Sequence, residues 1–357
     1  MMIIILFLLI LLFTVIEHQR KNNFHQALFI LSLFFIVLLE SIKFDSGMDF
    51  WNTYNHYQFF KLNDTRYRYE FLYKYLVYFF RNILNFSYPF FLFFYYSVIY
   101  SLYYFSLNKI TKYPITGLLL VFACTVGLFG SNRQLLAIAI GFFAYIYFLK
   151  EKKISYLVFI LIATFFHYSA FIYVFLLFLD RKINDKIWIV TLFALLLFNI
   201  TGLNFTIFNF VISNFAPEKI SYIIKGYNIG FAKMQSNYYM FVLGIIRRGL
   251  PIFLMIRYKN FLQHKSYYQL LLNTLFFSLA AYVFFFGKLE YMSSRVSVYF
   301  IILEVILYVW LIPVMNKMGK KNLYLIFLLL FAGLEFIKYV FSDPTPFVPF
   351  KTLFFSF

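Results

Sequence analysis

Arginines at the edges of apolar stretches are the residues of this sequence most capable of chemistry. Arg133 follows Gly130-Ser131-Asn132, and Arg295 follows Ser293-Ser294, each just before a long apolar run. Ser and Asn commonly cap helices, so both arginines are predicted in a first helical turn, where exposed N–H groups and the helix dipole attract anions. A guanidinium there matches a phosphate by paired hydrogen bonds. Two such arginines favour an anion site over side chains that merely reach towards water.

The adjacent pair Arg247-Arg248 lies inside an apolar run. It precedes the basic residue Arg257 by about ten residues, or about 15 Å of helix, which places the pair near the middle of a membrane. Gly249 and Pro251 follow, so the helix is expected to be broken or kinked at this depth. An arginine at the centre of a spanning helix costs about 2.5–3.5 kcal/mol on insertion scales. The pair therefore needs a water-filled cavity or an anionic partner.

Other side chains could accept protons or pair with these arginines. His167 stands between two short apolar runs, with Ser169 two residues on, and a histidine can exchange a proton near neutral pH. Asp49 begins an aromatic stretch, and Glu70 lies in the same polar segment. Asp49, Glu290 or a substrate could be the partner of the buried arginine pair. A structural histidine and solvated loop carboxylates are the alternative interpretation.

The elements that must position these side chains are membrane helices. The 357 residues are 63% hydrophobic and only 13% charged, whereas a soluble domain is about 45–50% apolar and about 25% charged. A globule of this length could not bury such an excess, and lipid is the solvent that suits it. The sequence predicts an all-α polytopic transmembrane helical bundle with about ten to twelve membrane segments. The long apolar runs fall at about 1–16, 27–42, 88–107, 114–130, 134–149, 187–202, 238–256, 267–286, 296–313 and 322–341.

Two shorter apolar runs, at 154–166 and 170–179, are separated by His167-Tyr168-Ser169. Each is short for a span, and together they are predicted to form a hairpin that returns to its own side. With the N-terminus outside, this hairpin brings the Lys- and Arg-rich loops to the cytoplasmic side, as the positive-inside rule requires. Two complete short spans would satisfy the loops equally well.

The chain is predicted to be a single integral membrane domain over residues 1–357, with external segments at 43–87 and 203–237. Within the first of these, residues 69–84 carry apolar and aromatic side chains at helical spacing, with Arg and Lys between them. This pattern is typical of an amphipathic helix that lies in the membrane interface.

Several classes of function have no support in the sequence. The net charge of +18 lies in loops that flank apolar runs, so no nucleic acid is expected as a partner. Cys124 is the only cysteine, which rules out a disulfide framework. The sequence holds no nucleotide-binding loop and no metal-ligand motif, and neither a cofactor nor a metal is expected.

Short motifs occur along nearly the whole chain. In order they are Gly47-Met48-Asp49 followed by Tyr54, Tyr69-Glu70, Arg133-Gln134 with Ala137 and Ala139, Phe166-His167-Tyr168-Ser169-Ala170, Ser294-Arg295 before Tyr299-Phe300, and Pro349-Phe350-Lys351. In this order and topology the chain resembles the EpsG family, which belongs to the Wzy-like polymerases of O-antigen, capsule and exopolysaccharide. It departs from the family pattern at Lys43-Phe44-Asp45, where an Arg-Gly-type approach is more usual, and at Phe350, where Tyr is common.

The resemblance implies an inverting, metal-independent glycosyltransferase of the bacterial cytoplasmic membrane, with its active site facing the periplasm or cell exterior. Its partners would be an undecaprenyl-diphosphate-linked oligosaccharide donor and acceptor, membrane lipid, and a chain-length-regulating co-polymerase. We expect catalytic roles for four residues, with His167 the first candidate base and Asp49 the second, and substrate binding by six more. The catalytic candidates are His167, Asp49, Arg133 and Arg248, and the substrate-binding candidates are Arg247, Arg295, Glu70, Tyr54, Gln134 and Ser169.

Two other functions would also explain charged residues in a membrane bundle. A flippase or other transporter of lipid-linked oligosaccharide would need buried arginines. A membrane acyltransferase that modifies glycan would use His167 near a cytoplasmic acyl donor.

Overall fold

The computed structural model describes residues 2–19, 24–47, 49–61, 69–215, 238–263, 267–287, 289–342 and 351–352. The side chains at 185, 215, 290–292, 294, 295 and 342 are not described.

The described chain is built from helices. Seven of them are long and apolar enough to cross a membrane, and α10 with α11 forms a bent pair that could provide an eighth crossing. The seven are α1 (Met2–Gln19), α2 (Phe24–Ile42), α5 (Tyr88–Ile110), α13 (Tyr238–Arg257), α15 (Tyr268–Phe285), α16 (Glu290–Lys317) and α17 (Lys321–Ser342). The predicted all-α polytopic membrane protein is thus confirmed.

The remaining elements are shorter. They are α3 (Phe50–Gln58), α4 (Phe71–Tyr78), the π-helical turn η1 (Phe79–Ile83), α6 (Pro114–Thr125), the 3₁₀ turn η2 (Val126–Leu128), α7 (Asn132–Phe148), α8 (Lys153–Phe166), the 3₁₀ segment η3 (Tyr168–Phe175), α9 (Leu176–Leu179), α10 (Asp185–Thr201), α11 (Leu203–Phe215) and α14 (Lys259–Leu262). Proline opens α5 and α6, where its missing N–H costs nothing.

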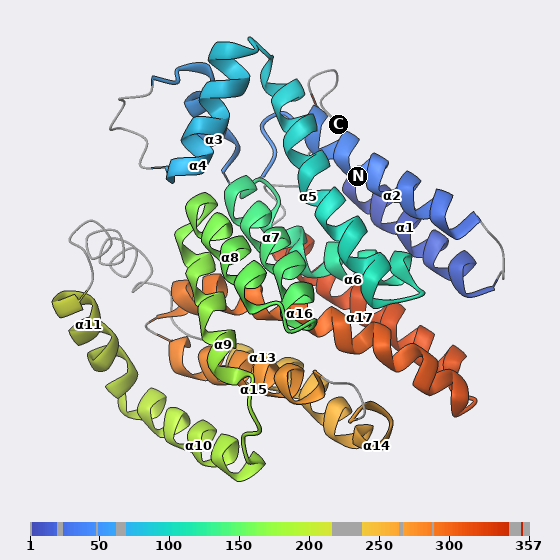
Figure 1. The fold of residues 1–357 in the computed structure, drawn as a ribbon, viewed down its shortest axis with the longest axis vertical. Helices are drawn as coiled ribbons and strands as arrows, with labels where there is room; N and C mark the ends of the chain where they lie inside the picture. Colours follow the sequence, from blue (N-terminus) through green and yellow to red (C-terminus); the bar gives the residue numbers. More distant parts are fainter. Residues whose placement is uncertain are drawn as a thin grey trace. The chain divides into compact units, whose positions relative to one another are not determined.

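The chain divides into two compact units, one formed by residues 1–173 and 308–357 and the other by 174–307, so that α16 contributes to both. In the first unit, α5 packs against α2 and α7, α7 packs against α8, and α6 packs against α1 and α17 (Figure 1). The helices α6 and α7 have almost no exposed side chains, as expected for the centre of a bundle.

One end of the first unit, here called the basic end, joins α1, α6 and α17. The Glu17 carboxylate accepts hydrogen bonds from the backbone N–H groups of Ile115 and Thr116, which are unpaired donors at the start of α6. The Lys321 ammonium donates to the His18 carbonyl at 3.1 Å. Lysines cluster in the loops at this end, at positions 109, 112, 150, 152, 153, 317, 320 and 321.

The polar turn predicted between the short apolar runs 154–166 and 170–179 is present, and it joins α8 to η3. The Tyr156 hydroxyl, near the start of α8, donates to the carbonyl of Tyr173 in η3, so the two arms run antiparallel on either side of the turn at His167. The Tyr173 ring lies on Gly141 of α7, where an added Cβ would come within 1.9 Å of a ring carbon. Glycine at that position therefore lets the hairpin approach α7 closely.

In the second unit, α10 and α13 both pack against α15. Trp188 stacks on Phe276 with ring centroids 5.4 Å apart, and its indole N–H donates to the Asn273 side chain. Gly202, with φ of +75°, ends α10 in the left-handed conformation that glycine tolerates best. The chain then turns by 88° into α11.

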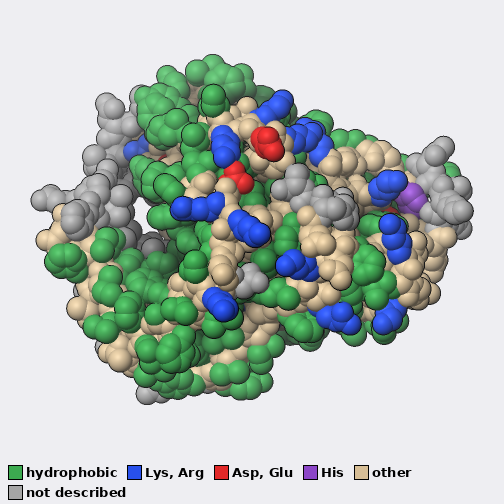
Figure 2. Space-filling view, turned by 60° about the horizontal axis from the view of Figure 1, so that its bottom comes forward, with side chains coloured by type: hydrophobic (Ala, Val, Ile, Leu, Met, Phe, Trp, Pro, Cys, Tyr) green, Lys and Arg blue, Asp and Glu red, His purple; other side chains and the backbone are tan. Residues whose placement is uncertain are grey.

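Figure 2 shows a face of the molecule on which Lys and Arg side chains stand among hydrophobic ones and acidic side chains are few. This distribution agrees with the net charge of +18. Exposed Phe, Ile and Leu side chains occur along most of the long helices, which is normal only where lipid replaces water.

Candidate functional site

The end of the first unit opposite the basic loops brings together the segments that carry most of the sequence motifs. We call it the motif end. Gly47 and Gly130 both have positive φ and lie against each other, because a Cβ added at Gly47 would meet the Gly130 Cα and the Phe129 carbonyl at 2.8 Å. The loop after α2 and the turn before α7 are thus in backbone contact.

Asp49 lies in this contact region, directly before α3. The Ser131 hydroxyl donates to its carboxylate at 3.0 Å, and the Thr53 hydroxyl donates to its carbonyl. Ser131 or Asn132 was expected to cap α7. Ser131 occupies the N-cap position but makes no capping hydrogen bond, because its hydroxyl is directed to Asp49 instead. Asp49 therefore ties the start of α3 to the start of α7.

Arg133 lies in the first turn of α7, as predicted, and pairs with a carboxylate of the protein itself. Its guanidinium donates to Glu70, which directly precedes α4 and is buried. The guanidinium carbon also lies 4.1 Å from the centre of the Tyr69 ring and 5.8 Å from that of Tyr73. The planar cation is therefore held on one face by aromatic rings and at its edge by a carboxylate.

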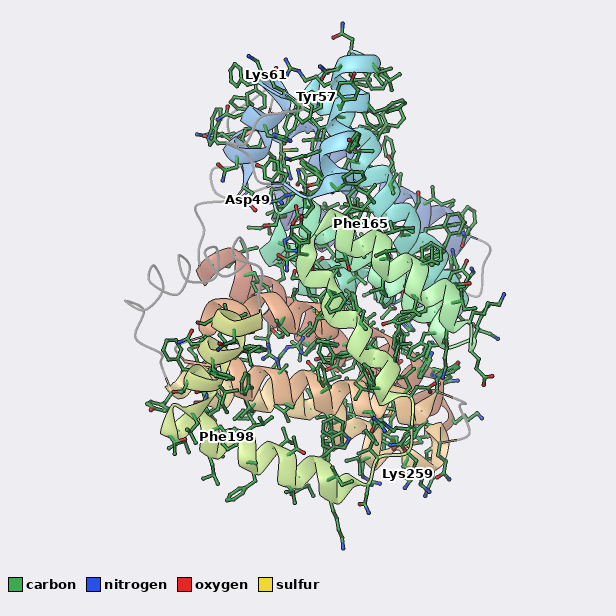
Figure 3. All side chains as sticks on the ribbon, turned by 60° about the vertical axis from the view of Figure 1, so that its left-hand side comes forward. Asp49, Tyr57, Lys61, Phe165, Phe198 and Lys259 are labelled. Carbon is green, nitrogen blue, oxygen red and sulfur yellow. The ribbon has the colours of Figure 1, made fainter. Side chains whose placement is uncertain are left out.

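His167 lies at the tip of the hairpin, at the same end as Arg133 and Glu70. Its Nδ1 shares a hydrogen bond of 2.6 Å with the Ser169 hydroxyl. Two residues before it, the Phe165 ring contacts the ring of Phe71, which directly follows Glu70, with centroids 6.2 Å apart. In Figure 3, Asp49 and Phe165 lie towards the same end of the first unit, below Tyr57 and Lys61. The structure thus brings the hairpin tip beside the start of α4.

Two further predicted residues belong to the same region. Tyr54 of α3 stacks on Phe50 at 5.6 Å and meets the Tyr88 ring edge-on at 5.3 Å, so it contributes to an aromatic layer over the start of α5. Gln134 follows Arg133 in α7 and is buried.

The C-terminal motif joins the motif end through Lys351. Its ammonium pairs with the Asp45 carboxylate, its carbonyl accepts from the Phe44 N–H at 2.9 Å, and the neighbouring Thr352 forms an antiparallel bridge with Lys43. The hydrogen bond from Lys351 holds the pKa of Asp45 below its ordinary value. The motif residues Met48, Pro349 and Phe350 lie outside the described residues.

The second unit holds the paired arginines. Arg247 donates to Glu304 of α16 at 2.5 Å, and both side chains are largely buried. Arg248 donates to the Ser297 hydroxyl at 3.0 Å and lies over the Tyr282 ring, with its guanidinium carbon 3.8 Å from the ring centre. The anionic partner of Arg247 is thus Glu304, which the sequence interpretation did not consider. A glutamate in the apolar stretch 296–317 was itself a signal, since carboxylates in spanning helices are rare and usually paired.

The helix is not broken after Gly249, because α13 continues from Tyr238 to Arg257 with Pro251 inside it. Proline there removes one backbone hydrogen bond and is a common cause of a kink, the other outcome that the sequence predicts. One expectation about a helix boundary was wrong. Arg295 does not fall in the first turn of its helix, because α16 begins at Glu290. The Arg295 side chain lies outside the described part of the chain.

A sequence profile of the EpsG family matches residues 26–352. The chain belongs to the EpsG family. No curated protein and no solved structure matches it significantly. The match runs from α2 to Thr352, so it covers the motif end and all of the second unit, while α1 of the first unit lies before it.

This EpsG-family chain also holds a buried polar network that the sequence interpretation missed. The Lys43 ammonium, 2% exposed, donates to Glu40 and to the Tyr96 hydroxyl, each at 2.7 Å. The Tyr96 hydroxyl donates to the Asn132 side chain, and the Tyr95 hydroxyl donates to the Asn132 carbonyl. Asn132 directly precedes Arg133 at the start of α7, so the network ends next to a residue of the candidate site.

Among the described residues, no three His, Cys, Asp or Glu side chains gather as a metal ion would require.

Proposed function

We propose that this protein is a polysaccharide polymerase that joins undecaprenyl-diphosphate-linked oligosaccharide units. The observation that carries the proposal is the Arg133–Glu70 pair stacked on Tyr69, beside Asp49 and the His167 turn, in a chain of the EpsG family. Most of the polar motif residues of the first unit converge there, at the end away from the basic loops.

The substrate class follows from the arginine. A lipid diphosphate bears negative charge at the membrane surface, and a guanidinium binds phosphate oxygens through parallel hydrogen bonds. Glu70 and Tyr69 hold the Arg133 guanidinium in place before substrate arrives, so little reorganisation is needed as charge develops on the leaving diphosphate. Glu70 is therefore proposed to position Arg133 rather than to bind sugar directly.

The reaction is a displacement at the anomeric carbon of the donor. The acceptor hydroxyl oxygen forms a bond to this carbon, while the bond to the diphosphate oxygen breaks and its electron pair stays on the diphosphate. Attack opposite to the leaving group inverts the configuration. His167 is the first candidate to take the hydroxyl proton. In the tautomer whose Nδ1–H donates to the Ser169 hydroxyl, Nε2 is the base nitrogen. Asp49 is the second candidate.

Two diphosphates have to be bound, one on the donor and one on the acceptor. Arg248 of the second unit is a further diphosphate ligand in this proposal, with Arg247 in support and Arg295 as an additional contact. Tyr282 beneath Arg248 and Glu304 beside Arg247 keep both cations oriented inside an apolar helix. Tyr54 and Gln134 are assigned to the sugar.

The orientation rests on the lysines of the basic end. By the positive-inside rule they face the cytoplasm, and the motif end then faces the periplasm or cell exterior of a bacterial cytoplasmic membrane. Polymerisation there would use single units that have already crossed the membrane.

The test is turnover by the purified protein supplied with lipid-linked repeat units and no added metal or nucleotide. We expect products that are two or more repeats long, with release of undecaprenyl diphosphate. A strain lacking the protein should accumulate single units on the outer face. Units trapped on the cytoplasmic face, together with no turnover in vitro, would assign the protein to transport instead.

A further inference from the structure

A second cationic site lies in the first unit, among residues to which the proposed reaction assigns no role. A hollow of about 350 Å³ is lined by Gln58, Phe59, Phe60, Lys61 and Arg81. It lies between the end of α3 and η1. Figure 3 labels its lining residue Lys61 and the nearby Tyr57. Two cations, an amide and two aromatic rings face it, and none of the lining residues that the structure describes is acidic. Such a lining suits an anion that carries an apolar body.

Arg81 is brought to this hollow by an unusual piece of helix. The segment Phe79–Ile83 is a π-helical turn that continues α4, and such turns are wider than an α-turn and occur frequently at functional sites. The chain closes it through the Leu84 and Phe86 N–H groups, which donate to the Phe79 and Phe80 carbonyls.

The same stretch presents a row of exposed apolar side chains. Phe71, Tyr75, Phe79 and Ile83 recur at every fourth position and are 57%, 48%, 45% and 59% exposed. On the other face of α4, Tyr73 and Val77 are fully buried against the first unit. The exposed row thus faces away from the protein core, and Arg81 lies between Phe79 and Ile83 in the sequence. An apolar row of this kind beside cationic residues is the arrangement of helices that lie in a membrane interface.

We propose that this hollow binds the phosphate headgroup of an anionic membrane phospholipid, with the acyl chains lying along the row of Phe71, Tyr75, Phe79 and Ile83. Lys61 and Arg81 hold the phosphate oxygens, and Gln58 contacts the polar headgroup. The charge of the lining selects an anionic lipid over a zwitterionic one of equal chain length. The exposed row selects a lipid over free phosphate, because only a lipid covers apolar surface. This inference stands apart from the proposed polymerase reaction.

The experiment is native mass spectrometry of the purified chain with phosphatidylglycerol or phosphatidylcholine of identical acyl chains. We expect phosphatidylglycerol to be retained about tenfold more than phosphatidylcholine, which corresponds to about 1.4 kcal/mol. The Lys61→Gln/Arg81→Gln double variant should lose this preference. Lys74→Gln is the matched control, because Lys74 is a cation of the same helix that does not line the hollow; it should retain the lipid as the wild type does.

Equal retention of the two lipids by the wild type, or retained preference in the double variant, would overturn the proposal. Two competitors identify the source of the phosphate. Inorganic phosphate at millimolar concentration should not displace phosphatidylglycerol, and displacement would reduce the site to an anion site. A polyprenyl diphosphate that binds more tightly than phosphatidylglycerol, and only with Lys61 and Arg81 intact, would reassign the hollow to the lipid carrier. If the double variant fails to fold, Arg81→Gln alone gives the same comparison.

Discussion

The Lys43 ammonium donates a hydrogen bond of 2.7 Å to the Tyr96 hydroxyl in a fully buried part of the first unit. The Glu40 carboxylate neutralises the lysine. The Tyr96 hydroxyl in turn donates a hydrogen bond to the side chain of Asn132, the residue before Arg133. A buried ion pair is weak evidence for stability, because desolvation offsets most of its attraction. Because the network ends at Asn132, next to Arg133, we expect it to help position Arg133.

Tyr96→Phe is expected to lower polymer formation several-fold while the protein remains inserted in the membrane. The change leaves the Asn132 oxygen without this donor inside the protein, at a cost of about 1–3 kcal/mol. Tyr103→Phe is the matched control, since Tyr103 lies two turns further along α5, is equally buried, and its hydroxyl has no hydrogen-bond partner among the described residues. Chain length and the KM for lipid-linked units are measured in both variants. Equal effects of the two substitutions would argue against positioning through Asn132.

Arg133→Ala and Arg248→Ala are each expected to abolish polymer, because each removes a guanidinium assigned to a diphosphate. Arg133→Lys keeps the charge but loses the planar fork and most of the stacking on Tyr69, so it should recover only a small part of the activity. Membrane insertion is checked by detergent extraction and elution as a single species. Wild-type chain lengths from either alanine variant would refute these roles.

Glu304→Gln is expected to destabilise the second unit by about 3–5 kcal/mol, because it leaves the Arg247 charge in an apolar helix without its carboxylate. The double variant Arg247→Met/Glu304→Leu should be markedly more stable than the single one. Thermal unfolding in detergent of the wild type and both variants gives the comparison. A double variant that is no more stable than Glu304→Gln would show that Glu304 is not the main partner of Arg247.

Gly141→Ala is expected to destabilise the contact between α7 and the hairpin, since the new methyl group overlaps the Tyr173 ring. Overpacking of this kind costs about 1–3 kcal/mol. Adding Tyr173→Leu should restore part of the stability, because the smaller side chain leaves room for the methyl group. Gly249→Ala is a control, as nothing lies within 4 Å of a Cβ at that position.

The Asp45–Lys351 contact predicts a pH dependence at the C-terminal motif. Because the pKa of Asp45 is lowered by Lys351, the contact is complete above the ordinary carboxyl value and is lost as the pH falls through the lowered one. Hydrogen exchange of the Phe44 amide, which donates to the Lys351 carbonyl, should therefore be slow from about pH 5 to 8 and accelerate, relative to its intrinsic rate, below about pH 4. In Lys351→Met the protection should be lower and lack this acid transition. A persistent transition in that variant would assign it to another carboxylate.

The sequence was sufficient to predict the membrane class, the family and the polar turn at His167. These depend on local quantities: the length of apolar runs, the lysines of the loops, and the polar triplet that interrupts 154–179. It was insufficient where the partner lies far along the chain. Glu304 meets Arg247 across 57 positions, and Tyr96 meets Lys43 across 53. The period of a helix indicates which face is apolar but does not identify the residue that a neighbouring helix presents.

The wrong start of α16 has a similar origin. Ser293 and Ser294 are good capping residues, but α16 already begins at Glu290, so neither stands at its start. Ser131 shows the converse case: the cap position was correct, while its hydroxyl serves a contact with Asp49 that no local pattern reveals.

The close approach of Gly47 to Gly130 limits which positions in this region tolerate substitution. Main-chain atoms make this junction, and a side chain at Gly47 would push the two loops apart. Exchanges of neighbouring side chains leave the spacing of the junction intact. The distance between the loops that carry Asp49 and Arg133 is therefore set by the main chain and not by the rings, amides and hydroxyls around the junction.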